Sequence, residues 1–225
     1  MFIRKDNKLK WNWIKWGAVV TLVLSLLGVL LFDMPLFNLI NNPSCNVDVP
    51  DTTNALCVTA LSLGAIFNWK VWVAFSLISV VAFFIYKAVK NEFDIRYAFV
   101  KIKNSYVFYL FLSIFFACGF TKILKIIIGR ARPIFADPML FNMFSGSNEF
   151  HSMPSGHTAI SFAGLVMLGM LFPKIKWATW ILAIVIGISR VYVGAHWVSD
   201  GIVGAFVGML CADFAKALLK KINSK

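Results

Sequence analysis

Residues 105–128 read SYVFYLFLSIFFACGFTKILKIII, an apolar run in which the charged side chains are two lysines near its end. A helix needs about 20 consecutive apolar residues to cross the hydrocarbon core of a bilayer. Five further stretches of the chain have a similar length and character. We therefore predict six membrane-spanning helices, near residues 14–32, 70–88, 105–128, 154–172, 177–195 and 198–217.

The overall composition supports this interpretation. Of the 225 residues, 60% are hydrophobic and 14% are charged, whereas about 25% of the residues in a soluble domain are charged. The chain is therefore too apolar for a soluble globular protein, and its length fits a single domain, residues 1–225. We expect an all-α integral membrane bundle that is solvated by lipid.

The basic residues predict how the bundle is oriented. Most of the 22 lysines and arginines fall in segments that six spans would place on one side of the membrane: 1–16, 87–103, 173–176 and 213–225. Cytoplasmic segments are enriched in Lys and Arg, so both termini are expected in the cytoplasm. The formal charge of +12 then reflects topology, and we expect no nucleic-acid partner.

A seventh apolar stretch, residues 55–69, is short for a span. A span here would reverse the sides of all the following loops and break the charge pattern. We predict instead an interfacial or re-entrant helix within an outer segment, residues 33–69. Residues 17–32 imitate the apolar part of a signal peptide, but no small-residue cleavage site follows them, and we predict an uncleaved first span.

Few ionisable residues remain on the outer side, and they include all three histidines. Ionisable groups near a bilayer are costly and usually functional. Cations that gather with imidazoles suit a multiply charged anion, phosphate above all. The cations and imidazoles are Lys70, Lys122, Lys125, Arg130, Arg132, Arg190, His151, His157 and His196.

Three blocks within this set have fixed internal spacing. They are Lys125-(six residues)-Arg132-Pro133, then Pro154-Ser155-Gly156-His157, then Ser189-Arg190-(five residues)-His196-(three residues)-Asp200. In this order the blocks resemble the signature of the type 2 phosphatidic acid phosphatase family. That family includes membrane lipid phosphatases, glucose-6-phosphatase and the soluble vanadium haloperoxidases. The resemblance implies a membrane enzyme that hydrolyses a phosphate ester or diphosphate through a phosphohistidine.

The residue types fit phosphoryl transfer, which depends mainly on positioning and charge neutralisation. Lys125 offers a point charge, while Arg132 and Arg190 offer forked donors that can hold two phosphate oxygens at once. Ser155 and Gly156 lie where a helix is predicted to begin, and free backbone N–H groups with the helix dipole favour an anion there. We predict that these five residues bind the phosphate.

His196 and Asp200 are four residues apart, a spacing that brings two side chains together on one face of a helical turn. A carboxylate on one ring nitrogen fixes the tautomer and leaves the other nitrogen free to attack phosphorus. The resemblance implies that His196 forms the phosphoenzyme and that His157 is the general acid and base. No metal-ligand motif is visible in the sequence, so we predict neither a metal nor another cofactor.

The blocks do not identify the lipid. Candidate substrates are undecaprenyl diphosphate, lipid A phosphates, phosphatidylglycerophosphate and phosphatidic acid. A lipid-to-lipid phosphotransferase would use the same phosphohistidine, and a non-catalytic lipid-binding or transport protein is a more distant alternative. Short loops favour a bacterial cytoplasmic (inner) membrane, with the site facing the periplasm or exterior. Beyond the substrate and the bilayer, we expect no required protein partner.

Other polar residues on the outer side have less specific roles. Lys122 is expected to snorkel to the interface rather than to bind a ligand. Arg130 either assists headgroup binding or marks the interface. His151 matches no position of the family signature and is expected to be a loop residue, and Asp137 and Glu149 are expected to shape the same loop.

The four cysteines divide into two pairs. Cys118 and Cys211 lie within predicted spans, where a thiol behaves as a small apolar side chain. Cys45 and Cys57 both lie in the outer segment, and paired thiols outside the cytoplasm tend to oxidise. We predict a Cys45–Cys57 disulfide, with two unrelated thiols as the alternative.

Overall fold

A computed structural model of the chain describes residues 9–45, 51–89 and 106–223. Within these ranges every regular element is helical and there is no β-strand, which confirms the predicted all-α class. The α-helices are α1 (Trp11–Leu27), α2 (Asp33–Ile40), α3 (Ala55–Ile66), α4 (Trp69–Val89), α6 (Tyr106–Ile128), α7 (Gly156–Leu171), α8 (Lys176–Tyr192) and α9 (Val198–Asn223). The shorter elements are a π-helical turn, η1 (Gly28–Phe32), and the 3-10 turns η2 (Pro133–Phe135), η3 (Asn148–Phe150) and η4 (Pro173–Ile175).

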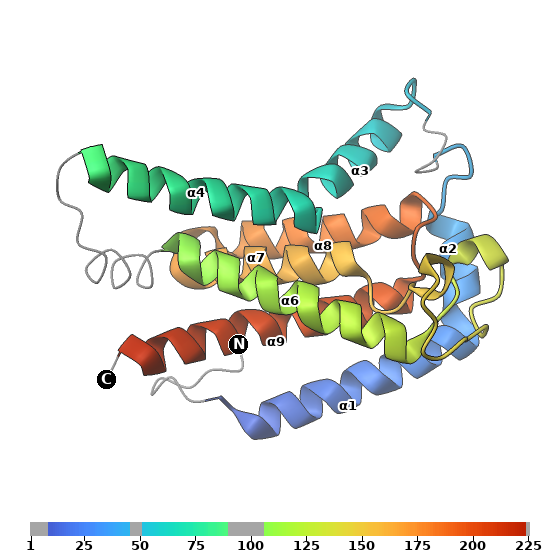
Figure 1. The fold of residues 1–225 in the computed structure, drawn as a ribbon. Helices are drawn as coiled ribbons and strands as arrows, with labels where there is room; N and C mark the ends of the chain where they lie inside the picture. Colours follow the sequence, from blue (N-terminus) through green and yellow to red (C-terminus); the bar gives the residue numbers. More distant parts are fainter. Residues whose placement is uncertain (1–8, 46–50, 90–105, 224–225) are drawn as a thin grey trace.

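The helices form an elongated bundle around α7 (Figure 1). Helix α7 packs most extensively against α9 and α8, and α6 packs against both α7 and α9. The α6–α7 connection, helix α2 and the start of α9 lie together at one end of the bundle, and the start of α1 and the end of α9 lie at the other. The end of α6, the start of α7 and the α8–α9 connection therefore meet at one end.

Among the residues that the structure describes, four helical stretches are long and apolar enough to cross a membrane. They are Trp11–Ile40, Tyr106–Ile128, Pro173–Tyr192 and Val198–Leu219, and each overlaps a predicted span. The span predicted over residues 154–172 corresponds to α7, which has only 16 residues and is largely buried by its neighbours. The remaining predicted span corresponds to α4.

The charged segments that predicted the topology are only partly covered by the structure. Residues 1–8, 46–50, 90–105 and 224–225 lie outside the described residues. Most of the predicted cytoplasmic loop 87–103 is among them, as is part of each predicted cytoplasmic end. The number of spans and the sidedness of the chain therefore stay predictions.

The first helix extends beyond its predicted span. Helical structure continues from α1 through the π-helical turn η1 into α2 and ends only at Ile40. Pro35 is the third residue of α2 and lies just after the π-helical turn. The continuation carries Asp33 into the protein, where its side chain is 1% exposed.

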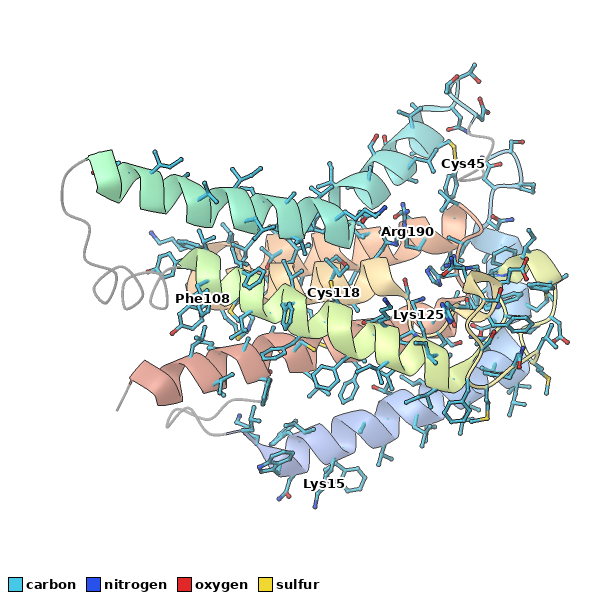
Figure 2. The ribbon with its side chains drawn as sticks, in the orientation of Figure 1. Lys15, Cys45, Phe108, Cys118, Lys125 and Arg190 are labelled. Atoms are coloured by element: carbon cyan, nitrogen blue, oxygen red, sulfur yellow. A yellow bond between two sulfur atoms is a disulfide. The ribbon has the colours of Figure 1, made fainter. Side chains whose placement is uncertain are left out.

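The short helix predicted in the outer segment is α3, which packs against α8. Its N-cap is Asn54, whose side chain accepts the backbone N–H groups of Leu56 and Cys57. Cys57 forms a disulfide with Cys45, with the two Cα atoms 5.5 Å apart, which confirms the predicted bridge. The bridge ties the loop after α2 to the first turn of α3, as Figure 2 shows near Cys45.

Helices α7 and α9 approach each other closely at two glycines of α9. A Cβ atom at Gly204 would lie 2.6 Å from the Ser155 carbonyl oxygen, and one at Gly208 would lie 2.4 Å from the Ala159 carbonyl oxygen. Both distances are below contact, so a larger residue would push the helices apart. The glycines thus hold the start of α7 beside Asp200, whose carbonyl oxygen accepts the Ser155 N–H at 2.9 Å.

Candidate active site

The second sequence block forms the N-terminus of α7. Ser155 is the N-cap and Gly156 is the first helical residue, as predicted. The Ser155 side chain makes no capping hydrogen bond to the backbone, and its hydroxyl oxygen accepts the Thr158 hydroxyl at 2.9 Å instead. Because the first N–H groups of a helix lack intrahelical partners, this turn can hold an anion.

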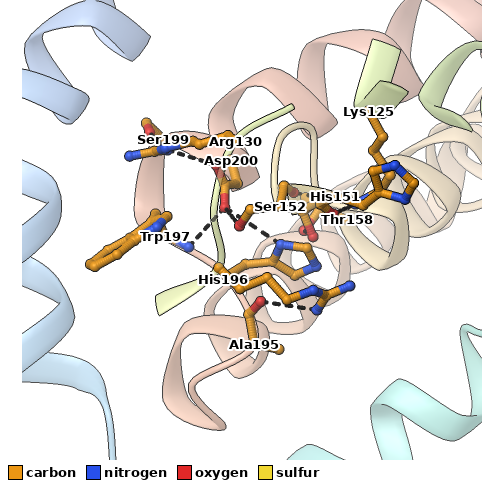
Figure 3. A network of polar contacts seen from close by, with 12 residues as sticks. Lys125, Arg130, His151, Ser152, Thr158, Ala195, His196, Trp197, Ser199 and Asp200 are labelled. Carbon is orange, nitrogen blue, oxygen red and sulfur yellow. Dashed lines mark hydrogen bonds and ion pairs between the residues drawn. The ribbon is translucent and has the colours of Figure 1, made fainter. Parts of the chain in front are cut away.

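The third block brings His196 and Asp200 together, as Figure 3 shows. Nδ1 of His196 and Oδ2 of Asp200 are 3.5 Å apart, and both side chains are buried. The geometry differs from the predicted helical turn, because His196 lies in the α8–α9 connection while Asp200 is in the first turn of α9. The carboxylate reaches back over that turn and also accepts the Trp197 backbone N–H at 2.9 Å.

Donors from outside α9 fix the Asp200 carboxylate. Oδ1 accepts a hydrogen bond from Nη1 of Arg130 at 2.7 Å, and Oδ2 accepts one from the Ser152 hydroxyl at 2.5 Å. A buried charge requires such partners, because an unpaired one is costly. Asp200 is therefore held in one orientation by the protein itself.

Burial dominates the electrostatics of His196. Desolvation lowers the pKa of His196 to about 3, with Lys125 and Arg132 adding to the shift and Asp200 opposing it. The ring is therefore neutral at ordinary pH. Because Nδ1 faces Asp200, Nε2 is the ring nitrogen that is available to another partner.

The three predicted phosphate-binding cations come from three different parts of the chain and act on the predicted catalytic histidines, His157 and His196. Lys125 lies in the last turn of α6, Arg132 follows that helix, and Arg190 lies in the last turn of α8; Figure 2 shows Lys125 and Arg190. All three cations act electrostatically on His157, and Lys125 and Arg132 also act on His196. Both imidazoles thus lie in the field of the first-block cations, and His157 also lies in that of Arg190 from the third block.

Each of these cations donates hydrogen bonds to backbone carbonyl oxygens. The pairs are Lys125 with His151 and Ser152, Arg132 with Asn148 and Ala195, and Arg190 with Ala60. Burial also lowers the pKa of Arg132, an effect that Asp200 opposes. A neutral carbonyl is a weaker partner for a cation than a phosphate oxygen, so these donors can pass to an anionic ligand.

The loop residues lie as predicted. His151 belongs to the α6–α7 connection, and its Nε2 atom is 2.8 Å from a loop carbonyl oxygen. Asp137 accepts a backbone N–H two residues ahead at 2.7 Å, and the Glu149 carbonyl oxygen accepts the backbone N–H of Arg132 at 2.9 Å. These contacts stabilise the loop that carries the first block. Lys122 lies outside that loop and is exposed on α6.

Both predicted roles of Arg130 are wrong. Its side chain is 0% exposed, so it neither reaches a headgroup nor marks the interface. Its guanidinium pairs with Asp33 at 2.6 Å and with Asp200 at 2.7 Å. The rings of Trp197 and Phe141 lie 5.6 and 5.9 Å from its central carbon. A buried arginine is stable there because two carboxylates pair with it.

The sequence did not single out three residues of this polar network, Asp33, Ser152 and Ser199. Asp33 accepts the Ser199 backbone N–H at 2.9 Å, and Ser152 donates to Asp200. A carboxylate that directly follows an apolar span is itself a signal, because charges there are costly. No comparable signal marks Ser152, since serine is common in loops.

The sequence model of the PAP2 superfamily matches residues 106–224, more than half of the chain. This chain therefore belongs to the PAP2 superfamily, which confirms the resemblance drawn from the three blocks. The matched region contains all three blocks and runs from α6 through α9.

Several characterised proteins are similar to this chain. It is 42% identical over 103 residues to the lipid A 1-phosphatase of Rhizobium johnstonii, a match that covers 44% of this chain and 42% of that protein. It is 34% identical over 101 residues to the undecaprenyl-diphosphatase of Sulfolobus acidocaldarius, covering 44% of this chain and 48% of that protein. The matches thus span less than half the length of these relatives.

Two solved structures share the fold. LpxE of Aquifex aeolicus superposes with a TM-score of 0.52 at 24% identity, covering 81% of this chain and 93% of that one. A transmembrane PAP2 type phosphatidylglycerolphosphate phosphatase from Bacillus subtilis superposes with a TM-score of 0.59 at 20% identity, covering 94% of this chain and 96% of that one. The fold therefore extends well beyond the matched region and includes the first helices.

Proposed function

We propose that this protein is a membrane lipid-phosphate phosphatase that hydrolyses a phosphate monoester or diphosphate on a lipid. The observation that carries the proposal is the meeting of all three blocks at one end of the bundle. There, Nδ1 of His196 lies 3.5 Å from Asp200, among the cations of the first block. The apolar helices around this end suit a substrate that is itself anchored in a bilayer.

In the first step, Nε2 of His196 attacks phosphorus, a P–N bond forms and the P–O bond to the lipid breaks. His157 gives a proton to the leaving oxygen. Positive charge develops on the His196 ring in this step. Asp200 stabilises that charge because its carboxylate is held beside Nδ1.

In the second step, water hydrolyses the phosphohistidine. His157, now deprotonated, accepts a proton from the water while the water oxygen bonds to phosphorus. The P–N bond breaks, and inorganic phosphate leaves with His196 neutral again. Burial favours this return, because it lowers the pKa of the free imidazole.

The phosphate oxygens are held by the five predicted binding residues. Lys125, Arg132 and Arg190 exchange carbonyl partners for phosphate oxygens. The first turn of α7, from Gly156 onward, directs free N–H groups at the same anion, and Ser155 is the N-cap of that turn. Charge neutralisation by these groups lowers the barrier to phosphoryl transfer.

We propose that the reaction requires no metal ion or other cofactor. Three cationic side chains act electrostatically on His157 and can neutralise the transferred group, a task that Mg²⁺ has in other phosphoryl-transfer enzymes. In the described ranges, no three His, Cys, Asp or Glu side chains are grouped so that they could hold a metal.

The proposed setting is a bacterial cytoplasmic membrane crossed by six helices. In this arrangement both termini are cytoplasmic and the site lies at the outer interface, facing the periplasm or exterior. The distribution of basic residues supports this orientation. The Cys45–Cys57 disulfide also supports it, because it lies at the site end and disulfides persist outside the cytoplasm.

The substrate class is tested by phosphate release from purified lipids in detergent. The panel contains lipid A 1-phosphate, undecaprenyl diphosphate, phosphatidylglycerophosphate and phosphatidic acid, and the relatives favour the first two. We expect the wild type to release phosphate from at least one lipid and His196→Ala to release none. Transfer of phosphate only after a second lipid is added would indicate a phosphotransferase. Lipid binding without either reaction would overturn the proposal.

A further inference from the structure

A buried chain of charges leads from the first helix to His196. Asp33, at the start of α2, is 1% exposed. Its Oδ2 atom accepts Nη2 of Arg130 at 2.6 Å and the Ser199 hydroxyl at 2.5 Å, and its Oδ1 atom accepts the Ser199 N–H at 2.9 Å. Asp33, Arg130 and Ser199, which are far apart in the sequence, thus meet at the start of α9.

Arg130 joins this carboxylate to the one that faces the imidazole. Nη1 donates to Oδ1 of Asp200 and to the Ser199 hydroxyl oxygen, each at 2.7 Å. Nε and Nη2 also donate to the Pro138 carbonyl oxygen at 3.1 and 2.9 Å. The guanidinium is therefore bonded on all sides and cannot turn without breaking several buried bonds.

The charges in this chain are unequal. Two carboxylates, Asp33 and Asp200, share the single guanidinium of Arg130, so the three side chains together carry a net negative charge. Of the two carboxylates, Asp200 is the one that faces Nδ1 of His196. If Asp33 were neutral, Arg130 would be unopposed and would cancel the charge of Asp200. The imidazole would then lose the negative partner that stabilises its developing positive charge.

We propose that Asp33 is a positioning residue for His196. It acts through Arg130 on the charge of Asp200, and through Ser199 on the place where α9 begins. This inference rests on the proposed phosphohistidine reaction and adds to it a residue outside the three sequence blocks. Asp33 touches neither the substrate nor His196, so its effect falls on the rate of the chemical step rather than on substrate binding.

The test is a kinetic comparison of Asp33→Asn with the wild type. Asn preserves the shape of the side chain and can still accept the Ser199 N–H, but it removes the charge. We expect kcat to fall about 10- to 100-fold, the range known for removing the hydrogen-bond partners that orient metal-binding histidines. KM and the affinity for vanadate should change less than about 3-fold, because the phosphate-binding cations are untouched. Asp51→Asn is the matched control, because Asp51 bonds Thr53 in an exposed turn.

A double-mutant cycle separates positioning from a general loss of stability. If Asp33 acts through Asp200, Asp33→Asn should cost little more once Asp200→Asn is present. Asp33→Glu, which restores the charge, should recover part of the lost kcat. Multiplicative losses in the cycle would overturn the proposal, as would an Asp33→Asn protein that keeps more than half of the wild-type kcat.

A second variant covers the case in which Asp33→Asn does not fold. Ser199→Ala removes the hydroxyl that links Asp33 to Arg130, and it should lower kcat about 3- to 10-fold with KM unchanged. An unchanged kcat would then overturn the inference. If the wild type and Asp51→Asn release phosphate while these variants match them, the phosphatase stands and the positioning role fails. A wild type that releases no phosphate overturns both.

Discussion

The guanidinium of Arg190 donates a hydrogen bond to the backbone carbonyl oxygen of Ala60. This contact joins a proposed phosphate-binding residue on α8 to α3, the short helix that carries Cys57. A Cβ atom at Gly64, one helical turn further along α3, would lie 1.9 Å from Nη1 of Arg190. The absence of a side chain at Gly64 therefore allows α3 to cover the arginine.

We expect Gly64→Ala to weaken phosphate binding. The added methyl group overlaps the guanidinium, so either Arg190 or α3 must move. The KM for the lipid and the inhibition constant for vanadate should each rise about 10-fold, the effect of losing part of one charge-assisted contact. Gly119→Ala is the control, because a Cβ atom there has no neighbour within 4 Å. Unchanged vanadate inhibition in Gly64→Ala would contradict this prediction and would show that α3, rather than a phosphate-binding Arg190, yields to the added methyl group.

Replacement of the proposed nucleophile should remove turnover. We expect His196→Ala to lose several orders of magnitude in kcat, because the remaining groups only bind the substrate. Asp200→Asn should be milder, because it disturbs the ring without deleting it. The measurement is phosphate release by protein of wild-type elution profile and thermal stability. More than a tenth of wild-type activity in His196→Ala would contradict the phosphohistidine mechanism.

Activity should persist in EDTA and be blocked by vanadate. Vanadate can adopt the five-coordinate geometry of the transition state, and the cations around His157 can hold it. Phosphate release is measured after dialysis against chelator, with and without added Mg²⁺. Activity that falls in EDTA and returns with Mg²⁺ would contradict the proposed metal independence.

The thiol count should show two free cysteines. Cys45 and Cys57 are bonded to each other, whereas Cys118 and Cys211 are free. Protein unfolded without reductant should therefore react with two equivalents of a thiol reagent, and with four after reduction. Four reactive thiols before reduction would rule out the disulfide in the isolated protein.

Acid should destabilise the wild type through His196. The pKa of its imidazole is about 3 in the folded protein and 6.5 by reference, so below about pH 6.5 the unfolded chain binds a proton that the folded chain does not. The stability that the neutral ring contributes is present above the unfolded pKa and is lost as the pH falls toward the folded one. The unfolding temperature should therefore fall more steeply between about pH 7 and about pH 4 for the wild type than for His196→Gln. Equal slopes would contradict a buried neutral imidazole.

The helical bundle and the three blocks were predictable because they are local properties of the sequence. An apolar run of sufficient length has few alternatives to a helix, and Ser155 before Gly156 marks a helix start. The His196–Asp200 contact was predicted correctly from its spacing, but for a partly wrong reason. His196 precedes the helix, and Asp200 reaches back to it as a residue of the first turn.

The contacts that sequence reasoning missed join distant parts of the chain. Asp33 and Arg130 are 97 residues apart, and Arg190 and Ala60 are 130 apart. The second contact uses a backbone carbonyl, which every residue has, so no side-chain pattern can reveal it. Arg130 was misread because a charged residue at the end of a span usually faces water or headgroups. Its burial depends on a carboxylate from another helix.

The π-helical turn η1, Gly28–Phe32, separates Asp33 from the rest of the first span. Such a turn holds one residue more than an α-helical turn, and one residue corresponds to about 100° of rotation about the helix axis. Because the turn already absorbs this extra residue, inserting one further apolar residue into it would swing the carboxylate away from Arg130 while hydropathy stayed almost the same. The length of this span is therefore under a constraint that its composition does not reveal. The ion pair of Asp33 with Arg130 links this helix, which lies outside the region that matches the superfamily model, to His196 inside that region.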